Sequence, residues 1–303
     1  MKRSLFLTFL WVFLIFGLAA CSAAGQTGSS SGWNLLKPVT ETPTPTLPPT
    51  PTPIPPTATP APTETAAPTV TPAPVMITVS PGQTVNVPIL LYHHIAEDAT
   101  GNRYFVPPAA FAEQMQWLHD HQYQTITISQ LADAIVYGGS IPERSVVITF
   151  DDGDEDVVKN ALPIMQQYGY VGTVYIIVRW IGAEGYDSAD EINQLIKAGW
   201  EIGSHSMSHV DLTQNEGNLQ YEVRESLLKL NQQFNVPIKS LAYPFGVIDS
   251  EVVTYTSKAG YSSAVGLGTS YQHNLDDLYY LVRMEVRQEY SLNDFIALLP
   301  YQN

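Results

Sequence analysis

Cysteine and positive charge are both scarce in this sequence of 303 residues. A single cysteine excludes an internal disulfide framework, and it excludes a zinc or iron–sulfur site built from several thiolates. Lys and Arg number 14 against 29 Asp and Glu, which gives a formal net charge of −15. A surface that binds nucleic acid or anionic lipid needs clustered Lys and Arg, so the composition predicts no nucleic-acid partner and no basic membrane-binding face.

The N-terminus lacks an apolar run long enough for a membrane span: residues 5–18 fall short of the roughly 20 that are needed. Lys2 and Arg3 precede this run, and the order of basic start, short apolar stretch and small residues is that of a secretory signal peptide. Leu18-Ala19-Ala20-Cys21 resembles the bacterial lipobox, in which the cysteine is lipidated and becomes the new N-terminus. We therefore predict a lipoprotein signal peptide over residues 1–20 and lipidation of Cys21; an uncleaved anchor is the alternative. Either way, the rest of the chain is expected outside the cytoplasm, as a bacterial cell-membrane lipoprotein facing the exterior or the periplasm.

Residues 21–74 have the composition of a tether. The segment begins with small polar residues, and residues 38–74 then hold 14 of the chain's 23 prolines, largely interleaved with threonine. Such a stretch buries too little apolar area to fold, and it favours an extended polyproline II conformation. We predict a disordered spacer that holds a domain of residues 75–303 away from the membrane.

Residues 75–303 alternate short apolar strands with amphipathic helices. This alternation predicts an α/β domain with a parallel sheet, either open or closed into a barrel. In both architectures the chemistry belongs at the C-terminal ends of the strands. The expected strands are 87–92, 124–128, 145–150, 173–178, 200–203, 240–243, 262–265 and 281–286, and the expected helices are 108–121, 130–136 (capped by Ser129), one through Leu162 and Met165, 189–198, 219–234, 250–258 and 292–299.

Two adjacent carboxylates, Asp151 and Asp152, follow the expected strand 145–150 directly, and Gly153 comes next. Consecutive residues of a regular strand point to opposite faces, so both aspartates can serve one site only if the strand ends there. Gly153 supplies the permissive backbone for that break. The pair suits a metal ligand beside a base, whereas Asp154 and Glu155 read better as a solvated turn that caps the next helix.

A second motif, His205-Ser206-Met207-Ser208-His209, follows the expected strand 200–203. Histidines at positions i and i+4 meet on one face of a helical turn and can both reach one metal ion. Two histidines and one carboxylate with an open position form a catalytic zinc-type ligand set. The alternative is a structural histidine pair, but the acidic motif at another strand end favours the metal site.

Together these motifs resemble the polysaccharide deacetylases, that is, the NodB-homology domain of carbohydrate esterase family 4. The resemblance implies a distorted (β/α) barrel in which Asp151 is the catalytic base and Asp152, His205 and His209 hold the metal. The third family motif is represented by Ala242-Tyr243-Pro244-Phe245-Gly246, which assigns the oxyanion-binding backbone N–H to Phe245.

The sequence departs from the common family pattern in two places. Ala242 stands where many members have an arginine that pairs with the base, and the late histidine motif that supplies a general acid is not visible. The segment 88–95 resembles the circularly permuted subgroup that acts on poly-N-acetylglucosamine, which places His93 in the acid role. His94 is the fallback, and His273 is the one later histidine. Arg283 is the candidate replacement for the missing arginine, with an ordinary surface arginine as the alternative.

The resemblance implies metal-dependent removal of N-acetyl groups from amino sugars of an extracellular or cell-wall polysaccharide, such as poly-N-acetylglucosamine, a chitin-like polymer or peptidoglycan. Zn²⁺ is the expected metal, and Ni²⁺, Co²⁺ or Fe²⁺ would fit the same ligands. The expected partner is an N-acetylated glycan polymer, the membrane is reached only through the lipid anchor, and we expect a monomer. The alternatives are another metal-dependent amide hydrolase and a catalytically inactive glycan-binding module.

Overall fold

The computed structural model describes residues 73–214 and 218–301. The predicted signal peptide, Cys21 and almost all of the predicted tether lie outside these residues. Among the described residues, no helix combines the length and the apolar character that crossing a membrane requires.

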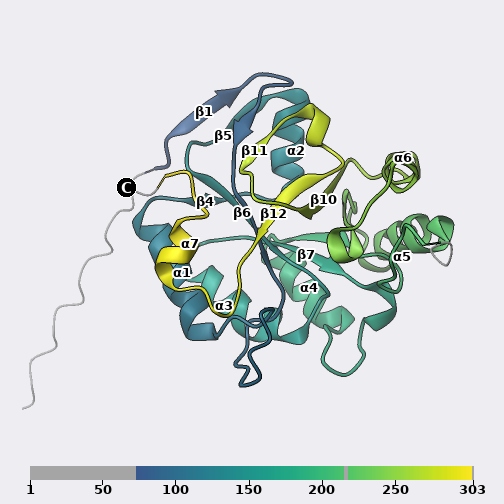
Figure 1. The fold of residues 1–303 in the computed structure, drawn as a ribbon, viewed down its shortest axis with the longest axis horizontal. Helices are drawn as coiled ribbons and strands as arrows, with labels where there is room; N and C mark the ends of the chain where they lie inside the picture. Colours follow the sequence, from purple (N-terminus) through teal and green to yellow (C-terminus); the bar gives the residue numbers. More distant parts are fainter. Residues whose placement is uncertain (1–72, 215–217, 302–303) are drawn as a thin grey trace, which may run out of the picture. The chain divides into compact units, whose positions relative to one another are not determined.

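Seven parallel strands close into a barrel (Figure 1). Their order around the barrel follows the sequence, and the last strand pairs with the first, Met284 lying opposite Leu90. The first two strands are joined as well, Ile89 opposite Val147. The strands are β3 (Ile89–Tyr92), β6 (Ser145–Phe150), β7 (Thr173–Ile176), β8 (Glu201–Ser204), β9 (Ser240–Ala242), β10 (Ser263–Leu267) and β12 (Leu281–Glu285). The predicted distorted (β/α) barrel is therefore confirmed, and it is the closed form of the parallel sheet.

Alternation along the strands divides the buried side chains into two layers. One set faces the barrel interior and includes Val147, Tyr175, Val265 and Leu281. The other set packs outward against the helices, as Ile148 does with the side chains of α1 and α3. The elements outside the barrel are α1 (Pro108–Asp120), α2 (Ile128–Tyr137), η1 (Val157–Ala161) continuing as α3 (Leu162–Gln166), α4 (Ala189–Lys197), η3 (Gln220–Glu225) continuing as α5 (Ser226–Phe234), α6 (Ser250–Ala259), α7 (Leu292–Ile296), and the short helices η2 (Val178–Trp180), η4 (Pro244–Gly246) and η5 (Leu275–Asp277).

Helix α2 begins earlier than predicted, and its cap is Thr127 rather than Ser129. The Thr127 hydroxyl accepts a hydrogen bond from the Gln130 backbone N–H, and the Gln130 side chain accepts one from the Thr127 N–H. This reciprocal capping box satisfies two backbone donors that the first turn leaves free. Ser129 instead donates its hydroxyl to Glu201, which ties the helix to β8.

Two small antiparallel pairs were not predicted. Strand β1 (Met76–Val79) pairs with β5 (Gly139–Pro142), and β2 (Val85–Asn86) pairs with β11 (Gln272–His273). Side chains from β1, β2 and β5 belong to the same buried cluster as the barrel interior. Strands of two to four residues contain too few alternating positions to be recognised in the sequence. The remaining strand, β4 (Gln124–Thr125), pairs with the start of β6 and is shorter than the predicted 124–128.

Candidate active site

The chain reverses abruptly at the end of β6. The Asp151 backbone N–H still donates to the Tyr92 carbonyl of β3 at 3.0 Å, whereas Asp152 has φ 69° and Gly153 φ 79°. The positive φ favours glycine at position 153, and a Cβ there would lie 2.9 Å from Ile176 Cδ1, so that side chain would have to shift. This turn lets both carboxylates face one cavity, as the sequence predicted.

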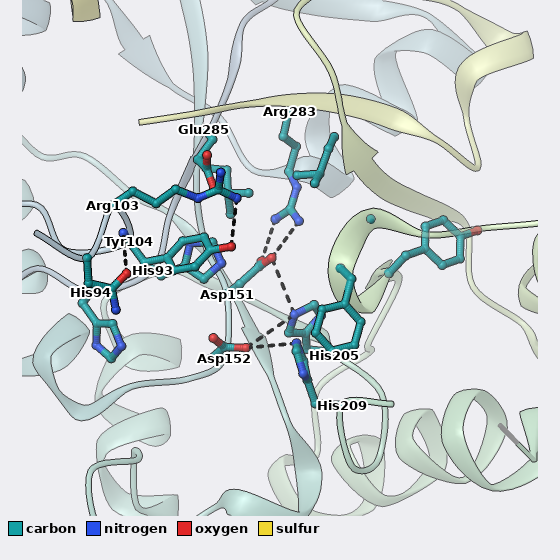
Figure 2. A pocket seen from close by; sticks show the side chains of 16 residues that line it. His93, His94, Arg103, Tyr104, Asp151, Asp152, His205, His209, Arg283 and Glu285 are labelled. Carbon is teal, nitrogen blue, oxygen red and sulfur yellow. Dashed lines mark hydrogen bonds and ion pairs between the residues drawn. The ribbon is translucent and has the colours of Figure 1, made fainter. Parts of the chain in front are cut away.

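Asp152, His205 and His209 converge on one point. Their candidate ligand atoms lie within 4.8 Å of one another, and Asp152 Oδ1 is 3.5 Å from the Nε2 atoms of both histidines (Figure 2). The predicted helical turn is wrong, because residues 205–209 form a loop in which Ser206 and His209 have positive φ. The Ser206 hydroxyl accepts a hydrogen bond from the His209 N–H, and this closes the loop so that the two rings approach.

The orientation of His205 is fixed from behind. Its Nδ1 lies 2.8 Å from the Ala242 carbonyl oxygen and donates to it, which leaves the Nε2 lone pair facing Asp152. Burial lowers the pKa of His205 to about 4, so the ring is neutral at neutral pH. Ala242 thus contributes through its backbone, although its side chain lacks the charge of the arginine expected there.

The three side chains fit a divalent transition metal. Asp152 Oδ1 is buried and has no hydrogen-bond partner among the described residues. Burial, together with the charge of Asp151, raises the pKa of Asp152 to about 7. A cation at this point would satisfy the orphaned oxygen and hold the carboxyl in its ionised form. Two imidazoles and one carboxylate are the donor set of open catalytic zinc sites.

Asp151 is held by Arg283 in a two-pronged ion pair. The guanidinium donates from its two terminal nitrogens at 2.6 Å and 2.7 Å, and both side chains are buried. The surface alternative for Arg283 is therefore wrong, and this residue of β12 supplies the arginine that position 242 lacks. Burial alone would raise the pKa of Asp151, but Arg283 and His205 outweigh it and hold that pKa well below its usual range.

The two histidines after β3 have different neighbours. Both line the same cavity as Asp151, and the ring centroid of His93 lies 4.5 Å from that of Tyr104. Burial lowers its pKa to about 4. His94 stacks on Phe105 at 4.0 Å, and its Nδ1 lies 2.8 Å from Asp156. The pKa of His94 is raised, because Asp156 and nearby carboxylates outweigh its burial. His273, on β11, is buried and does not line this cavity.

Asp154 is buried, which contradicts the predicted solvated turn. It forms a β-bridge with Tyr186, and the segment that ends at Asp187 covers it. Burial raises the pKa of Asp154 and of Asp187 to about 8 each. The sequence did not predict this contact, because it depends on a loop more than 30 residues away.

Phe245 lies on the other side of the histidine pair. It has φ 60° within η4, the residue is 58% exposed, and its ring centroid lies 4.6 Å from that of His209. The Gly246 N–H donates to the Tyr243 carbonyl and holds this turn. Four of the six non-glycine residues with positive φ in residues 73–214 and 218–301 are at this site: Asp152, Ser206, His209 and Phe245. Such strain persists only where the surroundings enforce it.

A cavity of about 260 Å³ lies between the proposed base, the candidate metal ligands and the turn at Phe245; its lining includes His93, Asp151, Asp152, His205, His209, Phe245 and Arg283. Its opposite wall comes from a loop, Asn102 to Tyr104, and from Leu267 and Glu285. Nothing in the sequence of this loop is distinctive, so this wall of the cavity was not predicted. The alternation Arg283-Met284-Glu285 was a usable signal, because it places both charged side chains on one side of the expected strand.

Comparison with known proteins agrees with the geometry. Residues 138–264 match the family model described as polysaccharide deacetylase. The chain is 29% identical to YxkH of Bacillus subtilis, an alignment that covers 70% of this chain and 76% of the relative. It is 27% identical to a poly-β-1,6-N-acetyl-D-glucosamine N-deacetylase of Staphylococcus aureus (strain MRSA252), covering 61% of this chain and 69% of the other.

Solved structures give the same fold. A polysaccharide deacetylase from Bacillus cereus superposes with a TM-score of 0.64 at 28% identity, over 71% of this chain and 69% of the other. IcaB from Ammonifex degensii, at 19% identity, shares the fold with a TM-score of 0.62 over 70% of this chain and 96% of the other. Over residues 138–264 the chain is thus similar in sequence to the polysaccharide deacetylases, and its barrel has the NodB-type fold of those proteins.

Proposed function

We propose that this protein is a metal-dependent N-deacetylase of an extracellular polysaccharide that contains N-acetylglucosamine. The observation that carries the proposal is the ion-paired Asp151 beside the cluster of Asp152, His205 and His209. A protein that merely binds a polysaccharide has no need of a buried, ionised base next to a set of metal ligands. The named activity of the S. aureus relative makes poly-N-acetylglucosamine the preferred substrate over peptidoglycan or a chitin-like polymer.

In this proposal Asp152, His205 and His209 hold the metal, which when bound polarises the acetyl carbonyl and lowers the pKa of an attacking water. Zn²⁺ is preferred, and Ni²⁺, Co²⁺ or Fe²⁺ would suit the same donors. Asp151 accepts the proton of the water, and Arg283 keeps its carboxylate ionised and in one orientation. The Phe245 backbone N–H donates to the oxyanion of the tetrahedral carbon.

The departing amine needs a proton, and His93 is the proposed donor. Because burial lowers its pKa to about 4, His93 is mostly neutral in the resting site. We infer that it becomes charged within the cycle, when the proton that Asp151 removes from water is passed on. Acetate and a free glucosamine amine are the products.

The test separates metal binding from turnover. Asp152→Ala and His205→Ala should each lose both the metal and the release of acetate, because each removes a ligand. Asp151→Asn should keep the metal and lose turnover by about 10²–10⁴, the worth of a positioned base. Metal content is measured by mass spectrometry, and acetate release is measured on poly-β-1,6-N-acetylglucosamine, chitin oligomers and peptidoglycan. Loss of the metal from Asp151→Asn would exchange the two aspartate roles, and no acetate from any glycan with wild-type holoprotein would overturn the proposed function.

A further inference from the structure

A row of alternating charges leads outward from the base. Arg283, Glu285 and Arg287 lie two residues apart on β12 and its continuation, while Met284 and Val286 between them are buried in the core. Side chains two apart along an extended chain point the same way, and four residues span about 13 Å. Their side-chain exposure rises along the row from 1% at Arg283 to 12% at Glu285 and 39% at Arg287.

Hydrogen bonds and ion pairs hold the outer part of this row in place. Glu285 lies between two guanidinium groups: its Oε2 accepts from Arg287 Nε at 2.8 Å, and its Oε1 is 3.5 Å from Arg103. Arg103 also donates to the Tyr104 hydroxyl at 2.9 Å, and its guanidinium lies 4.8 Å from the centre of that ring. Planar donors and acceptors are thus fixed in position and remain partly open to solvent.

This row borders a second cavity, of about 550 Å³. It shares Arg103, Leu267, Arg283 and Glu285 with the first cavity, so the two spaces adjoin at these residues. Figure 2 shows Arg103, Arg283 and Glu285 from the side of the first cavity. Its far wall includes Thr269, Tyr271 and Tyr290. The second cavity is about twice the size of the first, so a polymer whose reacting residue occupies the first has room to continue here.

We propose that the second cavity is a subsite for the neighbouring N-acetylated sugar residue of the same polysaccharide chain, a reading that rests on the proposed function. Guanidinium and carboxylate groups match the hydroxyl and acetamido groups of such a residue, and tyrosine rings offer apolar faces to a pyranose. The charges of Arg103 and Arg287 are offset by Glu285 together with Glu289, whose Oε1 lies 3.9 Å from Arg287 Nη1. The subsite therefore suits a neutral sugar better than an anionic one. The enzyme is therefore expected to need an oligomer for full efficiency.

The kinetic test compares substrates of increasing length. Wild-type kcat/KM for acetate release should rise at least tenfold from N-acetylglucosamine to its β-1,6-linked oligomers. Thr269→Trp, which places a bulky ring in the second cavity, should remove most of that gain. The matched control is Thr254→Trp, an exposed threonine of α6 outside both cavities, and it should keep the gain. Equal wild-type efficiency on monomer and oligomer, or an undiminished gain in Thr269→Trp, would overturn the subsite.

A binding measurement separates the subsite from the chemistry. Calorimetry on metal-depleted wild-type protein should show affinity that increases with oligomer length, and Thr269→Trp and Arg287→Ala should each weaken the binding of oligomers at least fivefold. Length-dependent binding without any acetate release by the holoprotein would uphold the subsite and overturn the deacetylase. If the holoprotein releases acetate but binding does not depend on oligomer length, or is unchanged in both variants, the deacetylase is upheld and the subsite is overturned.

Discussion

His93 and His94 end the same strand, yet they differ in what surrounds them. Both line the cavity with Asp151, but His93 packs against Tyr104, whereas His94 is paired with Asp156 and Asp154. We expect His93→Ala to bind the metal normally and to lose turnover of an N-acetylglucosamine oligomer by about 10²–10⁴, with a smaller loss on an activated acetyl ester. His94→Ala is the matched control and should lose less. Full amide activity in His93→Ala together with loss in His94→Ala would reassign the acid.

Asp187 gives a prediction about pH and stability. Both of its carboxyl oxygens are buried without a hydrogen-bond partner in the described part of the chain, and burial raises its pKa to about 8. In the unfolded chain the same carboxyl titrates near 3.9. Above about pH 4 the folded state therefore keeps a proton that the unfolded state loses. The contribution of Asp187 to the free energy of unfolding is complete below about pH 4, and it is lost as the pH rises through about 8.

Asp187→Asn should remove that pH dependence, because an amide has no charge to bury. The free energy of unfolding is measured with urea at pH 5 and pH 8. The value for the variant minus that for wild type should be larger at pH 8 than at pH 5 by a few kcal/mol. The exposed Glu184→Gln is the control and should follow wild type. A difference between Asp187→Asn and wild type that is the same at both pH values would mean that Asp187 is ionised in the folded protein.

At the scale of elements, Arg283 joins parts of the barrel that are distant in sequence. It lies on β12, bonds to Asp151 at the end of β6, and donates to the Gly266 carbonyl of β10 at 3.2 Å. Arg283→Ala leaves a buried carboxylate uncompensated and should lower the free energy of unfolding by about 3–5 kcal/mol. Asp151→Asn/Arg283→Ala should recover part of that loss in urea unfolding, since the remaining partner is neutral. Wild-type stability in the single variant would contradict this.

The sequence was sufficient where a local pattern is typical of one structure only. Strand β6 has the predicted limits, and Asp151 and Asp152 follow it as expected because a buried apolar run and Gly153 determine both ends. The loop at 205–209 was misread, since a spacing of four residues is shared by a helical turn and by a loop with positive φ at Ser206 and His209. Contacts across the barrel are not encoded in any local pattern. Arg283 could be suggested but not placed, and the burial of Asp154 was missed.

At the scale of the whole molecule, we propose that a lipid on Cys21 holds the barrel domain at the membrane. We expect Cys21→Ala to be secreted but no longer membrane-associated, because the acidic composition provides no other means of membrane attachment. Fractionation of cells into membrane and medium, with wild type as the control, measures this. Membrane retention of Cys21→Ala would instead indicate an uncleaved N-terminal helix.

The pairing of β12 with β3 has a consequence for biosynthesis. A nascent chain emerges from its N-terminus, so β3 and β6 are available long before β12. Until β12 has been synthesised, β3 has no partner on one side. The Asp151 carboxylate also lacks its ion-pair partner, because Arg283 lies 132 residues later in the sequence. A polypeptide that ends before β12 would therefore lack both the strand that closes the barrel and the Arg283 side chain that pairs with Asp151.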